Sequence, residues 1–356
     1  MQEINEIREL LAAINYPGTS KNIVDLGMVR RVSAEGRRVA LQLAFQRSND
    51  PFALPLKRRC EEALAAAGRE AAIELIFSDG RERPPSLDGV RRVIAISSGK
   101  GGVGKSTVAS NLAVALVTLG YRVGLVDADI FGPSIPGMFG AADERPFMVE
   151  VDGRERVQPV ERLGVKILSI GFFVEAGSAT VWRGPMASNA LKQMIEEGHW
   201  GDLDYLLVDL PPGTSDIHLT LVQTVALDGA IVVSTPQRVA LEDAVKGINM
   251  FESPAIGVPV LGIVENMSWF TPAELPGNRY YLFGKGGAAR LAAERGLPLL
   301  GEIPIVLGIM EGGEEGRPAA LATTGDVPAI FLALGRRVAA AVASLPAGGK
   351  RARTGR

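Results

Sequence analysis

Residues 93–107 read VIAISSGKGGVGKST: an apolar run, a glycine-rich turn and the start of a second apolar stretch. The first run is rich in β-branched residues, which is typical of a buried strand, and residues 106–120 have the spacing of a helix. In this context the turn predicts a phosphate-binding loop, because glycines let backbone N–H groups close around phosphate oxygens at a helix N-terminus. The predicted nucleotide-binding residues are Gly99, Lys100, Gly101, Gly102, Val103, Gly104, Lys105, Ser106 and Thr107.

The side chains of this loop predict ATP and Mg²⁺ as ligands. Lys105 is expected to reach the β- and γ-phosphates, Ser106 to ligate Mg²⁺ and Thr107 to touch the α-phosphate. Hydrolysis also needs a carboxylate near the metal ion. Asp209 ends the apolar run YLLVD and precedes a switch-like glycine, Gly213.

Two further aspartates, Asp127 and Asp129, end the run VGLVDAD and are expected beside the loop. An aspartate at a strand end can equally be a helix cap or a turn residue. Their combination with the loop favours a nucleotide site.

From about residue 92 onward, apolar runs alternate with helical stretches, which predicts an α/β fold with a mostly parallel sheet covered by helices on both faces. Binding sites of such sheets lie at the carboxyl ends of the strands. The runs are RRVIAISS (91–98), YRVGLVDAD (121–129), VKILSIGF (165–172), YLLVDLP (205–211), GAIVVSTP (229–236), VPVLGIVENM (258–267) and PLLGEIP (298–304).

A small α+β domain is predicted before this fold, over residues 1–82, with the element order α-β-β-α-β. Residues 83–91 are expected to link it to an ATPase domain over 92–346, and a basic, disordered tail is expected over 347–356.

The composition is that of an ordinary globular protein, with 47% hydrophobic and 22% charged residues and a net charge of −2. No global field therefore draws the chain toward nucleic acid or membrane, and the N-terminus lacks an apolar signal core. One cysteine, Cys60, and two histidines exclude an internal disulfide and disfavour a Cys/His metal cage. We expect a cytoplasmic protein with no nucleic-acid or membrane partner.

The segments GKGGVGKST, VDADIFGPSIP, RGPM, LLVDLPPGTSD and ENMSWF resemble the Mrp/ApbC family of iron–sulfur cluster carrier ATPases. That family belongs to the deviant-Walker class, which includes MinD and ParA, and the resemblance covers residues 92 to about 345. The first ~80 residues resemble a SufT-like iron–sulfur assembly domain, with IVDLGMV as the recognisable piece.

The resemblance implies a homodimer in which Lys100 reaches the ATP of the partner subunit. An added cation of this kind stabilises transition-state charge as an arginine finger does. It also implies that Asp129 orients the attacking water, that Asp209 holds Mg²⁺ through water and that Asn266 contacts adenine. Arg183 of RGPM is either a dimer-face residue or an ordinary surface arginine.

The sequence departs from the family where the cluster ligands are expected. The family carries a Cys-x-x-Cys pair shortly after ENMS, but Pro272, Ala273, Glu274 and Leu275 stand here. Because such clusters need thiolates, no iron–sulfur ligand is identified, and we expect no cluster to be bound in the family's usual way. The segment 49–51 likewise lacks the Cys-Pro of the assembly domain. Cys60 is either a buried structural thiol or a ligand.

The predicted function is ATP hydrolysis in iron–sulfur cluster assembly or delivery, with assembly or client proteins as partners. Two alternatives remain at this level: a ParA/MinD-like positioning ATPase that acts on membrane or DNA, and a nucleotide-sensing scaffold without hydrolysis. The apolar stretch 329–345 is expected to pack on the sheet and not to form an amphipathic membrane helix.

Overall fold

The computed structural model describes residues 2–17, 19, 21–45, 52–77, 84–130, 132–173, 184–213, 222, 227–253, 256–272 and 274–345. The chain divides into two compact units, Met1–Arg81 and Glu82–Arg356. Within the described ranges, none of the helices is both long enough and apolar enough to cross a membrane.

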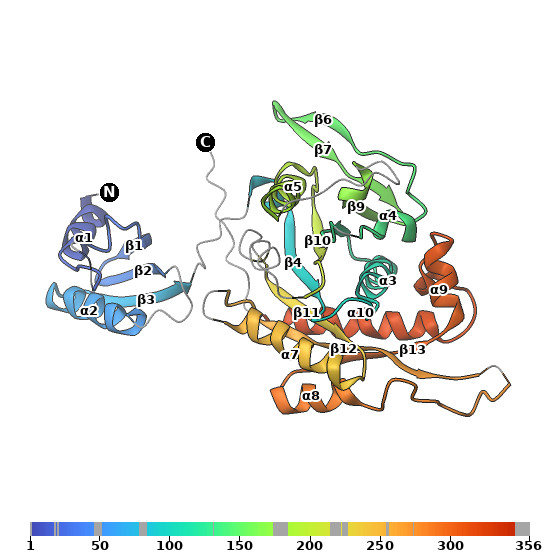
Figure 1. Cartoon of the computed structure of the whole chain (residues 1–356). Coiled ribbons are helices and arrows are strands. Elements are labelled where there is room, and N and C mark those ends of the chain that lie inside the picture. Colours follow the sequence, from blue (N-terminus) through green and yellow to red (C-terminus); the bar gives the residue numbers. More distant parts are fainter. Residues whose placement is uncertain are drawn as a thin grey trace. The chain divides into compact units, whose positions relative to one another are not determined.

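The first unit has the predicted element order (Figure 1). Strands β1 and β2 are antiparallel, β2 and β3 are parallel, and the sheet order is β1-β2-β3. Leu11, Leu43 and Leu56 belong to the buried core between the sheet and the helices. The elements are α1 (Gln2–Ala12), β1 (Val29–Glu35), β2 (Arg38–Phe45), α2 (Ala53–Ala66) and β3 (Glu70–Phe77).

The second unit is built on an eight-stranded sheet of order β13-β12-β11-β4-β10-β5-β9-β8, in which all neighbours are parallel except β8 and β9. All seven strands predicted from the apolar runs are present. The strands are β4 (Val90–Ser97), β5 (Val123–Asp127), β8 (Val160–Arg162), β9 (Val165–Ser169), β10 (Leu203–Asp209), β11 (Gly229–Ser234), β12 (Val260–Phe270) and β13 (Leu299–Ile305).

Helices cover both faces of this sheet, as predicted. Side chains of β4 alternate between two buried clusters: Val93 and Ala95 pack with α5, α7 and α8, whereas Ile94 and Ile96 pack with α3 and α10. This alternation explains why residues 93–96 of the strand are apolar without interruption. The longer helices are α3 (Lys105–Thr118), α5 (Gly184–Glu197), α7 (Arg238–Glu252), α8 (Gly287–Arg295), α9 (Leu307–Glu314) and α10 (Val327–Ala343).

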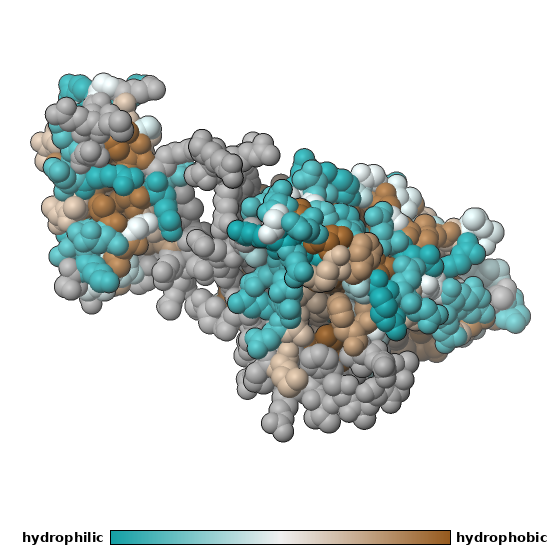
Figure 2. Space-filling model, turned by 90° about the horizontal axis from the view of Figure 1, so that it is seen from above, coloured by the Kyte–Doolittle hydropathy of each residue, from teal (hydrophilic) through white to brown (hydrophobic). Residues whose placement is uncertain are grey.

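Helix α10 packs against α3 and β13 and buries Phe331, Leu334 and Val338, which confirms the expectation that this apolar stretch covers the sheet. Figure 2 shows that the surface of each unit carries apolar residues set among hydrophilic ones. The exposed apolar side chains include Leu54 in the first unit and Leu282, Leu307 and Met310 in the second.

Three small features were not predicted. A hairpin of β6 (Phe147–Val151) and β7 (Arg154–Gln158) precedes β8, and β8 adds an antiparallel edge to the sheet. The segment expected to be a linker also differs at its end: η1 (Pro85–Leu87) and the start of β4 belong to the second unit, and Leu87 and Val90 are buried in its core. The remaining short elements are α4 (Ile135–Met138), η2 (Ile170–Phe172) and η3 (Ala319–Leu321).

Candidate nucleotide site

The predicted phosphate loop joins the end of β4 to the start of α3 at the carboxyl edge of the sheet. Gly102 and Gly104 have φ of 80° and 81°, the left-handed region that glycine adopts without steric cost. Gly99 is needed for a different reason: a Cβ there would collide with the backbone of Asp243 and Ala244 in α7. The loop is therefore held closely against α7.

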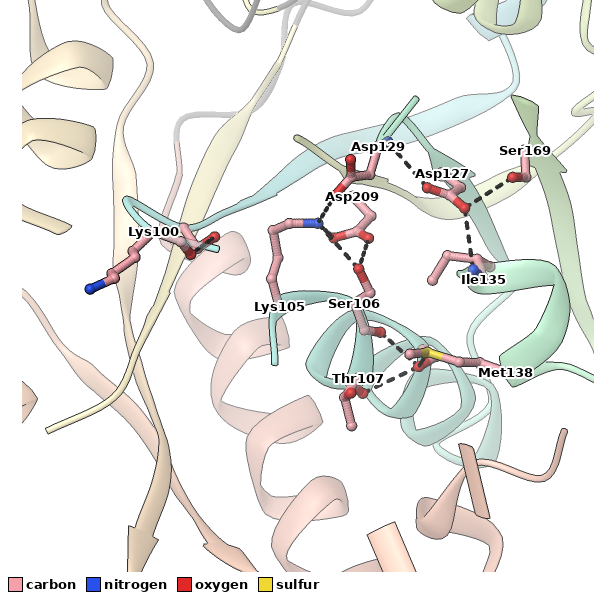
Figure 3. Close-up of polar contacts among 12 residues, drawn as sticks. Lys100, Lys105, Ser106, Thr107, Asp127, Asp129, Ile135, Met138, Ser169 and Asp209 are labelled. Atoms are coloured by element: carbon pink, nitrogen blue, oxygen red, sulfur yellow. Dashed lines mark hydrogen bonds and ion pairs between the residues drawn. The ribbon is translucent and has the colours of Figure 1, made fainter. Parts of the chain in front are cut away.

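The ammonium group of Lys105 lies in a buried polar cluster (Figure 3). Its Nζ is 2.7 Å from Asp209 Oδ1 and donates at 3.2 Å to Ser106 Oγ, and Ser106 Oγ donates to Asp209 Oδ2 at 2.5 Å. Lys105 is 5% exposed and Asp209 is fully buried. The lysine and hydroxyl of the predicted loop and the carboxylate predicted about 100 residues later thus meet in one network.

Asp209 is a buried carboxyl group whose pKa is raised by desolvation. The charge and the hydrogen bond of Lys105, together with the hydrogen bond from Ser106, oppose this rise. An ionised Asp209 consequently depends on Lys105 for its compensation.

Asp127 and Asp129 stand two residues apart but serve different purposes. Asp127 is fully buried and accepts hydrogen bonds from the Asp129 backbone N–H, the Ile135 backbone N–H and the Ser169 hydroxyl, at 3.1, 3.2 and 2.9 Å. Desolvation and the charge of Asp209 raise the pKa of Asp127 to about 7, against the hydrogen bonds of Ser169 and Ile135 and the charge of Lys105. Asp127 is thus an anchor that fixes the backbone of its neighbour.

Asp129 is positioned at the mouth of the cluster. Its carboxylate is 16% exposed and lies 3.8 Å from Lys105 Nζ. The carboxylate of Asp129 is therefore partly open to solvent and also close to the ammonium group of Lys105.

Asn266 reaches the loop from β12. Its Nδ2 donates to the carbonyl of Val103 at 2.8 Å, and a Cβ on Gly104 would collide with that amide. Glycine at 104 is therefore required both by its φ and by the approach of Asn266.

Lys100 is exposed and extends away from the Lys105 cluster (Figure 3). Its backbone is held in place, because Ser98 Oγ donates to the Lys100 carbonyl at 3.0 Å. Gly213, after Asp209, has φ of 92° and donates its N–H to the Ser98 carbonyl at 2.9 Å. The predicted switch glycine thus contacts the first turn of the phosphate loop.

One member of this site, Ser169, was missed by the sequence reasoning. It ends β9, the strand beside β5, and its hydroxyl donates to Asp127. The available signal was a polar residue at the end of an otherwise apolar run, although the sequence did not indicate that β9 adjoins β5.

The donor set at the start of α3 fits Mg²⁺ bound with a nucleotide. Ser106 Oγ and Asp209 supply a hydroxyl and a carboxylate oxygen that already touch each other. Magnesium keeps several waters and takes one or two carboxylates plus phosphate oxygens, so it needs no larger cage. Among the described residues no group of three or more His, Cys, Asp or Glu side chains is arranged to hold a metal ion by itself.

Cys60 lies apart from this site, in the core of the first unit. It is fully buried, and desolvation raises the pKa of its thiol to about 11, opposed by the charge of Arg59 and assisted by that of Glu61. Of the two readings of Cys60, this environment favours a buried structural thiol.

Beyond β12, Leu275 donates its backbone N–H to the Pro272 carbonyl at 3.1 Å, so the region of the family's cysteine pair is a turn. Arg183, Ala273 and the segments 49–51 and 347–356 lie outside the described residues.

Comparisons with known proteins agree with this geometry. A family model for the NUBPL iron-transfer P-loop NTPase matches residues 89–338, and a model for an iron–sulfur cluster assembly protein matches residues 4–75. The iron–sulfur cluster carrier protein of Salmonella typhimurium is 50% identical over 338 residues, which cover 93% of this chain and 90% of that protein. The Escherichia coli protein of the same name is 42% identical over 337 residues, with coverages of 93% and 90%.

A solved structure gives the same picture of the second unit. A nucleotide-binding protein from Archaeoglobus fulgidus in complex with ADP is 38% identical, with a TM-score of 0.57, and the match covers 69% of this chain and 94% of that one. The resemblance seen in the sequence motifs is confirmed, and the chain belongs to the NUBPL iron-transfer P-loop NTPase family.

Proposed function

We propose that this protein is a homodimeric ATPase that acts in the delivery or assembly of iron–sulfur clusters in the cytoplasm. The observation that carries the ATPase part is the buried network of Lys105, Ser106 and Asp209 on a phosphate loop. The iron–sulfur part rests on the names of the relatives, which are iron–sulfur cluster carrier proteins.

In the proposed reaction the backbone N–H groups of the loop bind the phosphates of ATP, and Lys105 pairs with the terminal phosphate. Lys105 exchanges its partner in this step, because its ammonium otherwise lies 2.7 Å from Asp209. Asp209 and Ser106 are then available to hold Mg²⁺, which supplies charge neutralisation at the phosphates.

Asp129 is the proposed water-orienting residue, since it is the partly exposed carboxylate next to Lys105. The water oxygen forms a bond to the γ-phosphorus while the bond from that phosphorus to the β,γ-bridging oxygen breaks, which yields ADP and phosphate. Asp127 supports this step by accepting the Asp129 N–H. The anchor limits the movement of the catalytic backbone.

Lys100 is proposed to act in trans, on the nucleotide of the partner subunit. Its exposed side chain is directed away from its own cluster, and in a dimer a cation of this kind adds positive charge at the partner's phosphates. Asn266 is proposed to contact the base, from its position against Val103.

We further propose that the cluster is carried by a partner protein, which this ATPase contacts in a nucleotide-dependent way. Cys60 is the one cysteine of the chain and is buried in the first unit. Two copies in a dimer supply two thiolates, and carboxylates such as Glu274 do not replace four thiolates around sulfide-bridged iron.

The experiment for the ATPase is a titration with ATP and Mg²⁺ followed by phosphate release, on the wild-type chain and on Lys105→Ala. Among the described residues of one subunit, Lys105 is the cation placed for the terminal phosphate, so ATP binding of the variant should be abolished. Unchanged ATP affinity in Lys105→Ala would refute the site.

The experiment for the cluster is anaerobic reconstitution with iron and sulfide, desalting and iron counting. We expect no stable cluster. About four irons per dimer that disappear in Cys60→Ser would overturn the proposal and make Cys60 a ligand.

A further inference from the structure

Met267 has a backbone conformation that its place in the fold does not explain. Among the described residues, φ is positive at three positions other than glycine: 51° at Asp152, 53° at Leu163 and 57° at Met267. Asp152-Gly153 and Leu163-Gly164 are two-residue turns of β-hairpins, where positive φ is required. Met267 lies within β12 and joins no hairpin.

The strand is irregular at this point. The pairing of β12 with β13 shifts register between Asn266 and Phe270, and the buried Ser268 donates its hydroxyl to the Glu265 carbonyl at 2.9 Å. A left-handed residue without the freedom of glycine is strained, and such strain is concentrated at functional sites.

The irregularity lets two consecutive side chains reach the same loop. In a regular strand, neighbouring side chains point to opposite faces. Here Asn266 donates to Val103, and the Met267 methyl carbon Cε lies 3.7 Å from where a Cβ of Gly104 would stand. The positive φ of Met267 thus adds a half-buried apolar group beside the start of α3.

The sheet order indicates which part of a nucleotide Met267 would meet. The phosphate loop follows β4, and Asp129 and Asp209 approach it from β5 and β10, on one side of β4. β12 lies on the opposite side, beyond β11. A nucleotide with its terminal phosphate at Lys105 and these carboxylates therefore extends its nucleoside toward Met267.

We propose that Met267 is a specificity-determining residue that forms an apolar wall for a purine base. This inference rests on the nucleotide binding proposed above and assigns the base end of that site. A thioether is polarizable and packs favourably on an aromatic ring. Asn266, fixed through one N–H to Val103, supplies polar recognition next to it.

The test compares binding of ATP and of inorganic tripolyphosphate, each with Mg²⁺, by calorimetry on the full chain. Met267→Ala should bind ATP about tenfold more weakly, because apolar contact with the base is lost. Its affinity for tripolyphosphate should stay within about twofold, and Met267→Leu should retain ATP affinity within about threefold. An equal loss for both ligands, or no loss for ATP, would overturn the proposal.

Thermal melting of the ligand-free variants tests the strain separately. Both Met267→Gly and Met267→Ala remove the side chain, but only glycine relieves the positive φ. Met267→Gly should therefore melt about 2–4 °C above Met267→Ala. If Met267→Ala melted above Met267→Gly, the backbone at this position would not be strained, and the argument for the assignment would be overturned.

The wild-type chain separates this proposal from the one it rests on. Binding of tripolyphosphate and ATP with equal affinity would overturn the base site and leave the phosphate loop standing. Binding of neither ligand would refute the proposed function first.

Discussion

Removing the charge of Lys105 should destabilise the ligand-free protein by leaving Asp209 buried without its cation. In Lys105→Met the stem is retained, the 2.7 Å ion pair is lost and the 2.5 Å hydrogen bond from Ser106 remains. Breaking a buried pair costs about 3–5 kcal/mol. Because Ser106 still compensates part of the charge, we expect a loss of about 3 kcal/mol in the free energy of unfolding.

The matched control is Lys105→Met combined with Asp209→Asn, which removes both charges. We expect this double variant to recover about 2 kcal/mol relative to Lys105→Met, because no uncompensated carboxylate is left. Urea unfolding of the wild type, the two single variants and the double variant gives the coupling energy directly. A coupling below about 0.5 kcal/mol would refute the reasoning.

The stability deficit of Lys105→Met should depend on pH, and the pKa shift of Asp209 determines the direction of that dependence. Burial raises the pKa of Asp209, and loss of Lys105 removes its strongest opposing influence, so the carboxyl group of Lys105→Met binds its proton more tightly in the folded state. A carboxyl group with a higher pKa in the folded state than in the unfolded state stabilises the fold at pH values below its unfolded pKa of 3.8. This contribution is lost as the pH rises through the pKa of the folded state. The deficit of Lys105→Met should therefore be small near pH 4 and grow toward neutral pH. A constant deficit over that range would contradict the assignment.

Three further predictions use other features of the structure. Lys100→Ala should keep ATP binding but lower turnover at least about tenfold, and mixing it with Asp129→Ala should restore activity if heterodimers form and Lys100 acts in trans. Cys60, with its pKa near 11, should react with iodoacetamide in the native protein far more slowly than in urea at pH 8, and its contribution to stability should fall as pH rises from 9 to 11. Gly99→Ala should destabilise the fold by about 1–3 kcal/mol in urea unfolding, because its Cβ collides with backbone at Asp243.

Much of the candidate nucleotide site could be predicted from sequence because it is made of residues at strand ends. Lys105 and Ser106 lie in a contiguous motif, and Asp209 follows an apolar run, so the rule for carboxyl ends of parallel strands brings them together. The seven parallel strands were predictable for a second reason. A strand that is buried on both faces contains an almost continuous apolar run, which is visible in the sequence.

The parts that were missed depend on contacts that local sequence does not encode. The anchoring of Asp127 by Ser169 requires knowledge that β9 adjoins β5. The positive φ of Met267 coincides with a register shift against β13, about 35 residues away in sequence, and methionine itself signals no such conformation. The edge strand β8 is only three residues long, too short to show a period.

The turn that follows β12 makes this chain a suitable host for an engineered gain of function. Pro272 and Leu275 have the spacing of a Cys-x-x-Cys pair and are joined by a backbone hydrogen bond of 3.1 Å. The single native thiol is buried in the other unit, so cysteines installed at these two positions would be the only accessible ones among the described residues. Their capacity to acquire iron could be measured without background from Cys60. Such a chain would show whether two cysteine side chains are sufficient for iron binding or whether the surrounding scaffold must change as well.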